Sequence, residues 1–199
     1  VMPEEFVLQE QKLANFHDMP NHEQLVQLSM LEQDGRHHRR LRMLVLREFS
    51  RQFVEKHRNM IQQYVDRLLT PLLEKRDIDF VAELAAHVPG HIIGNILGVP
   101  DEDCPQLRIW SENIVQYFDA DRTEVNKQLA ESATTEFKDY LVRLIAAREN
   151  KPQDDLLSVL IAAKNAGELD ETELISLSLL ILAGGHGSTI DVLGTGLLA

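Results

Sequence analysis

A run of cationic side chains between Arg36 and Arg42 is the first part of the sequence that could do chemistry. It reads Arg-His-His-Arg-Arg-Leu-Arg. Residues four positions apart lie on one face of a helix, so His38 and Arg42 could direct two donors at one carboxylate and anchor it. Alternatively, the whole run forms a solvated cationic face. A metal site at His37 and His38 is disfavoured, because adjacent helical residues point about 100° apart. No residue of the sequence is assigned to a metal.

The second candidate is the run Gly-Gly-His-Gly-Ser-Thr at residues 184–189, within a stretch from 174 to 190 that carries no Asp, Glu, Lys or Arg. Each glycine costs a helix about 1 kcal/mol relative to alanine, so close helix packing or a flat ligand against the backbone should need the room. The hydroxyl of Ser188 can bond a carbonyl one turn back. We expect a local widening of the helix over 184–188, facing an open cavity. The alternative is tight packing around a buried histidine.

Helical periodicity dominates the elements that must position these residues. Apolar residues recur at i, i+3 and i+4 from Arg51 to Lys75, with Pro71 expected to kink or shorten the end of that helix. Asp170 and Glu173 form a capping-box signature at the start of the last helix, which runs towards the end of the chain. Strand patterns are nearly absent, so the fold class is all-α (mainly α), with at most a short strand near Ile78. Further helices are predicted after Asp79, up to Gly98, from Asp101 to about Phe118, from Thr123 to about Arg148 and from Asp155 to about Asn165, and Val1 to Gln33 is predicted as a loop.

Composition narrows the classes of partner. The net charge is −12, from 20 Lys and Arg against 32 Asp and Glu, which argues against nucleic acid or an anionic membrane surface as a partner. The single cysteine, Cys104, excludes an internal disulfide, and no signal peptide pattern is visible, so we expect a cytoplasmic protein. The uncharged stretch 174–190 is borderline in length for a membrane span. Its glycines and hydroxyls favour a helix buried across the centre of a protein instead.

Three stretches, in the same order along the chain, resemble the bacterial, soluble cytochromes P450. They are residues 30–42, the Ile-Gly-Asn-Ile-Leu-Gly-Val-Pro sequence at 93–100, and residues 182–198. The likeness covers about residues 25 to 199. It implies the helical portion of the cytochrome P450 fold and a haem cofactor.

The resemblance implies roles for the cationic run. In this family a His-x-x-x-Arg pair on the third major helix contacts a haem propionate, and the register of the run makes His38 and Arg42 that pair. The family's haem thiolate lies in a Phe-x-x-Gly-x-x-x-Cys loop, whereas Cys104 has Pro100 four residues before it and is therefore not the haem ligand. We expect residues 1–199 to be part of a single cytochrome P450 domain, an internal fragment that lacks the N-terminal sheet region and the C-terminal haem-cysteine region.

The resemblance also implies roles for the glycine-rich run. Family members carry small residues, then an acid and an alcohol, in the helix that crosses the haem, where acid and alcohol deliver protons. An ungapped match through residues 193–198 places Gly184 and Gly185 at the small positions and Ser188 at the alcohol. Gly187 takes the place of the acid, so the acid–alcohol pair is incomplete. A glycine cannot relay a proton, although ordered water can partly substitute.

The implied function is that of a haem-thiolate monooxygenase. Such an enzyme would oxidise a medium to large apolar small molecule, such as a secondary metabolite, with dioxygen and with electrons from a redox partner such as a ferredoxin. The alternative is a helical binding or scaffolding protein that kept the fold and lost oxygen activation. The loop before His38 and the helix at 177–181 indicate an apolar pocket and do not identify the substrate.

Overall fold

The computed structural model describes residues 18–46, 49–116 and 123–198. Within these residues no strand is formed, including around Ile78, so the all-α prediction is confirmed. The elements are α2 (Pro20–Gln27), α3 (Gly35–Leu46), α4 (Arg51–Leu72), the π-helical turn η1 (Val81–Ala85), α5 (Val88–Leu97), the 3₁₀ turn η2 (Asp101–Asp103), α6 (Cys104–Gln116), α7 (Glu124–Asn150), α8 (Leu156–Asn165) and α9 (Glu171–Gly196).

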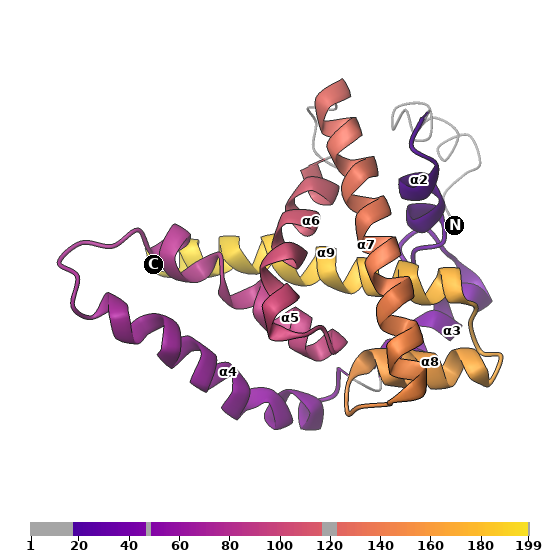
Figure 1. The fold of residues 1–199 in the computed structure, drawn as a ribbon, viewed down its shortest axis with the longest axis horizontal. Coiled ribbons are helices and arrows are strands. Elements are labelled where there is room, and N and C mark those ends of the chain that lie inside the picture. Colours follow the sequence, from indigo (N-terminus) through magenta and orange to yellow (C-terminus); the bar gives the residue numbers. More distant parts are fainter. Residues whose placement is uncertain (1–17, 47–48, 117–122, 199) are drawn as a thin grey trace.

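Helix α9 crosses the centre of the fold and is the element around which the others pack (Figure 1). Helices α2, α5, α6 and α8 all contact it, α7 packs on α6, and α4 contacts α5 and η1. One hydrophobic core joins α2, α5, α6, α7, α8 and α9, because each contributes at least one side chain with no exposed surface. These side chains include Leu25, Leu97, Leu107, Phe137, Leu157 and Leu182.

Side chains cap the starts of α7, α8 and α9, close to where the sequence predicted these helices to begin, and the capping box predicted at Asp170 is confirmed. The side chains of Thr123, Asp155 and Asp170 each accept a hydrogen bond from the backbone N–H three residues later, at 3.2, 2.8 and 2.8 Å. The carboxylate of Glu173 accepts in return from the backbone N–H of Asp170 at 3.0 Å, which completes the capping box. Each cap stabilises its helix by about 1 kcal/mol, since it satisfies backbone donors that have no partner in the first turn.

The predicted loop from Val1 to Gln33 is wrong in part, because helix α2 lies inside it; residues 1–17 lie outside the described residues. Proline stands at the start of α2, where its fixed φ angle suits a helix, but Met19 offers no capping side chain. The usual start signal was therefore missing. The predicted helix end near Phe118 also lies outside the described residues.

Within the described residues, α9 is the helix that is long and apolar enough, by length and composition, to cross a membrane. In its most apolar 18-residue window, 39% of the residues are buried inside the protein. Its buried residues lie mainly between Leu174 and Leu182, where α2, α6 and α8 surround it. This first half of α9 is therefore part of the protein core.

Candidate functional site

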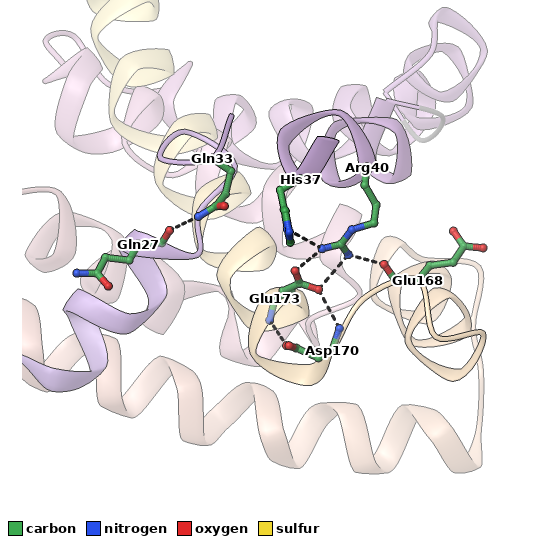
Figure 2. A network of polar contacts seen from close by, with 7 residues as sticks. All are labelled: Gln27, Gln33, His37, Arg40, Glu168, Asp170 and Glu173. Carbon is green, nitrogen blue, oxygen red and sulfur yellow. Dashed lines mark hydrogen bonds and ion pairs between the residues drawn. The ribbon is translucent and has the colours of Figure 1, made fainter. Parts of the chain in front are cut away.

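Arg40 of helix α3 is directed at the start of α9 (Figure 2). Its guanidinium donates to both carboxylate oxygens of Glu173, one at 3.0 Å, and to the backbone carbonyl of Glu168. Glu173 is also the residue that closes the capping box of α9, so one carboxylate joins the start of α9 to α3. The sequence reasoning missed this role of Arg40, because its partner lies 133 residues further along the chain.

His38 and Arg42 lie four residues apart in α3 and therefore share one face of that helix. His38 is half-buried and Arg42 is exposed. Neither side chain makes a hydrogen bond or ion pair with any of the residues that the structure describes, in contrast to Arg40. The donors of this pair are thus available to an anionic group, and their contact with a propionate stays a prediction.

Ser188 and Gly184 face each other across one turn of α9. The Ser188 hydroxyl donates to the Gly184 carbonyl at 3.0 Å, as predicted, and both residues are exposed. The predicted widening over 184–188 is wrong, because α9 is α-helical from Glu171 to Gly196. A single bond from a serine to the carbonyl one turn back is compatible with an ordinary α-helix. The open face of the helix is created by the missing side chain of Gly184, because a Cβ atom added there would meet no described atom within 4 Å.

Gly185 points in a different direction from Gly184. A Cβ atom added to it would lie 2.8 Å from Cγ1 of Ile93 in α5, and closer still to the end of that side chain. Real Cβ atoms do not approach other atoms so closely. The missing side chain of Gly185 therefore makes room for the packing of α9 on α5. Its predicted role at the cofactor stays a prediction.

An apolar cavity of about 250 Å³ lies beside the open face of α9. Its wall combines residues before α3 with residues of α6 and α9, as the apolar stretches had indicated. Polar side chains, among them Ser29 and Glu32, also border it. The cavity reaches the small residues just before the Ser188 turn. Its apolar lining includes Leu25, Ile114, Leu179, Leu180, Ala183 and Gly184.

His186 lies on the opposite, buried side of the same run, with 1% of its surface exposed. Its Nε2 atom has no hydrogen-bond partner among the described residues and lies next to Gly90 of α5. Burial lowers the pKa of the imidazole, which favours the neutral form. This residue matches the predicted alternative of a buried histidine in a tightly packed helix, and it does not reach the open face.

Comparison with known proteins places this geometry in a family, although no family model matches the sequence. The polyketide biosynthesis cytochrome P450 PksS of Bacillus subtilis is 37% identical over 171 residues, which are 85% of this chain and 41% of that protein. The cytochrome P450 monooxygenase PikC of Streptomyces venezuelae is 34% identical over 86% of this chain and 40% of its own length. The crystal structure of myxobacterial cytochrome P450 CYP267B1 in complex with myristic acid superposes with a TM-score of 0.85 at 29% identity, over 99% of this chain and 47% of that one.

The fold and the sequence relatives agree, and the chain belongs to the cytochrome P450 family. It spans about two fifths of the length of the curated relatives that it matches. The cofactor of this family is haem. The described residues fit one edge of a haem site, because His38 and Arg42 offer two free cationic or polar donors and Gly184 leaves the backbone of α9 uncovered.

Proposed function

We propose that the protein is a haem-thiolate monooxygenase that oxidises a medium to large apolar small molecule in the cytoplasm. The observation that carries this proposal is the apolar cavity that reaches α9 at Ala183 and Gly184, one turn before Ser188. Small-molecule sites of about 300–1,000 Å³ are typically apolar with a few polar groups. A cavity of about 250 Å³ can hold part of such a ligand. The name of the relative PksS, from polyketide biosynthesis, supports a secondary metabolite as the substrate class.

The residues of this chain would bind and orient rather than carry the redox chemistry. Haem, when bound, supplies the activation of dioxygen, with electrons from a redox partner such as a ferredoxin. His38 and Arg42 would hold a propionate by charge-assisted hydrogen bonds. Gly184 would let the haem face approach the helix, and Ser188 would offer a hydroxyl oxygen to an ordered water. The family's cysteine loop is outside this sequence, so residues 1–199 would contribute part of one domain.

The proposal is tested on the full-length protein by its carbon monoxide difference spectrum. A band in the thiolate region, together with a spin-state shift on adding an apolar ligand, is the expected result. A protein that binds no haem, or haem without a thiolate band, contradicts the proposal. The second candidate, a helical binding protein without oxygen activation, is favoured by Gly187 at the place of the acid. This second candidate would be supported if the apolar ligand binds but no product forms when electrons are supplied.

The propionate anchor is tested separately by replacing His38 or Arg42 with alanine. A hydrogen bond to a charged group is worth about 1.5–3 kcal/mol, so each variant should lose haem roughly ten- to a hundredfold faster to an excess of a haem acceptor. Arg39→Ala is the matched control, because Arg39 is an exposed cation of the same helix. Equal haem loss from all three variants would show that only the total charge of α3 matters.

A further inference from the structure

A second cavity, of about 540 Å³, lies between α4, α5, η2 and α6 and has no part in the proposed oxidation. It brings together three side chains of the kinds that ligate transition metals: the imidazole of His91, the carboxylate of Asp101 and the thiol of Cys104. Imidazole, carboxylate and thiolate are the three donor types of protein zinc sites. Other lining residues include Tyr64, Arg67, Arg108 and Glu112.

The distances between the three donors are close to those of a tetrahedral site. One ligand atom from each of His91, Asp101 and Cys104 lies within 4.8 Å of the other two, and His91 Nε2 is 3.9 Å from Asp101 Oδ1. Zinc bonds of about 2.3 Å to sulfur and about 2.0–2.1 Å to nitrogen or oxygen require donors roughly 3.3–3.8 Å apart. Closing the site therefore needs the donor separations to shorten by about 1 Å, and Asp101, whose side chain is 60% exposed, is the donor with the most freedom to move.

The imidazole of His91 is already held in an orientation suited to a ligand. Its ring is buried and stacks on Tyr64, with the centroids 3.6 Å apart and the planes 8° from parallel. The side-chain amide nitrogen of Asn95 is 3.3 Å from His91 Nε2 and 3.1 Å from Asp101 Oδ1. An amide nitrogen can only donate, so Nε2 accepts this hydrogen bond with its lone pair, and a metal ion bound at Nε2 would take the place of the Asn95 donor.

The thiol of Cys104 is positioned by a glycine in the neighbouring helix. A Cβ atom on Gly94 would lie 2.6 Å from Cys104 Sγ, so the absence of that side chain makes room for the sulfur. The thiol donates to the carbonyl of Pro100 at 3.6 Å. A divalent cation bound to Cys104 would displace the thiol proton, so that the sulfur binds as a thiolate.

We propose that His91, Asp101 and Cys104 form a binding site for a soft divalent cation of the zinc type, with its fourth coordination position open to the cavity. The site joins α5, η2 and α6, which meet at the turn after Gly98. Asn95 serves as a positioning residue, since its amide donates to the Asp101 carboxylate and to the backbone carbonyl of His91, both at 3.1 Å. The inference is independent of haem chemistry, because none of these residues lies on the open face of α9.

The test uses the haem-loaded, full-length protein, so that the family's haem cysteine is occupied, and zinc itself as the probe. Competition with a chromophoric chelator should reveal one tight site per chain. Cys104→Ser and Asp101→Asn preserve side-chain size, and each should weaken zinc binding by at least about tenfold, the lower end of losses seen even for outer-shell residues. His87→Ala is the matched control, because this exposed histidine lines the same cavity outside the cluster and its loss should leave zinc affinity unchanged.

Zinc X-ray absorption gives the decisive readout on the donors. One sulfur at about 2.3 Å, with the remaining donors nitrogen or oxygen at about 2.0–2.1 Å, is the expected coordination shell. The proposal is overturned if no zinc binds at micromolar concentration, or if the shell contains no sulfur. It is equally overturned if Cys104→Ser binds as tightly as the unchanged protein, or if His87→Ala weakens binding as much as Asp101→Asn. An unchanged haem spectrum in each variant shows that the fold is intact.

Discussion

The two halves of helix α9 differ in what holds them. From Glu171 to Leu182 the helix is fixed by a capping box, by Arg40 and by buried side chains on several sides. From Gly184 onward it has an exposed face on which Gly184 and Ser188 lie, and a buried face on which Gly185 and His186 pack against α5. One continuous helix thus carries a structural half and a half whose open face is free for a ligand. Adjacent glycines of the sequence therefore have different roles: Gly184 lies on the open face, and Gly185 allows close packing on α5.

The largest expected effect tests the packing role of Gly185. Gly185→Val should lower the free energy of unfolding by about 3 kcal/mol, because overpacking a close helix contact costs roughly 1–3 kcal/mol and valine adds three methyl-sized groups against Ile93. Gly187→Val is the matched control, since nothing lies within 4 Å of its added Cβ. Urea unfolding of both variants measures the difference. Equal stabilities would remove the distinction between the two glycines.

The next effect concerns the charged end of the helix. Arg40→Ala should destabilise the protein by about 1–2 kcal/mol, because hydrogen bonds to a charged group contribute about 1.5–3 kcal/mol and this pair is partly exposed to solvent. Arg39→Ala, the exposed neighbour, should change stability by less than about 0.5 kcal/mol. The same urea measurement compares them. A loss of similar size in both variants would mean that α3 acts only through its overall charge.

The local signals of α9 could be predicted from the sequence, and the long-range ones could not. Asp170 and Glu173 are three residues apart, so their reciprocal hydrogen bonds follow from the helix itself. The partner of Glu173 on α3 depends on how two distant helices meet. Similarly, the run at 184–189 predicted a bond from Ser188 to the preceding turn, but which glycine faces α5 depends on the position of Ile93. The expected widening failed because one serine bond does not break an α-helix.

Helix α2 is a whole element that local sequence signals did not predict. Its start lacks a local capping side chain, and the carboxylate of Glu131 in α7 accepts instead from the backbone N–H groups of Asn21 and His22, at 3.1 and 2.9 Å. Burial of Leu25 and contacts with α9 stabilise the helix further. The Ser176 hydroxyl, for example, donates to the Leu25 carbonyl at 2.6 Å across 151 residues of sequence. Tertiary contacts of this kind outweigh weak local preference, and they cannot be inferred from adjacent residues.

A pH titration sharpens the assignment of Arg40. Its hydrogen bonds hold the pKa of the Glu173 carboxyl below the usual 4.5. A carboxyl whose pKa is lower in the folded state stabilises the protein above its unfolded pKa, and this contribution is lost as the pH falls below about 4.5. The stability difference between the unchanged protein and Arg40→Ala should therefore be constant near neutral pH and shrink as the pH falls below about 4.5. A difference that stays constant over this range would contradict the ion pair.

The smallest effect is expected at Ser188, on the open half of α9. Its hydroxyl hydrogen is directed to the Gly184 carbonyl, and the acid that would complete a relay is replaced by Gly187. A positioned acid or base typically contributes about 10²–10⁴-fold to a rate, so a hydroxyl without that partner should contribute less than about tenfold. Ser188→Ala should accordingly reduce product formed per electron consumed by less than about tenfold at unchanged haem content. Gly187→Asp supplies the missing acid and should raise the product formed per electron consumed when Ser188 is present. The increase should be smaller when Ser188 is replaced by alanine, because the acid and the hydroxyl would act together. Complete inactivation of Ser188→Ala with haem retained would show that Ser188 delivers protons without an acid beside it, and would overturn the view of this turn as an incomplete relay.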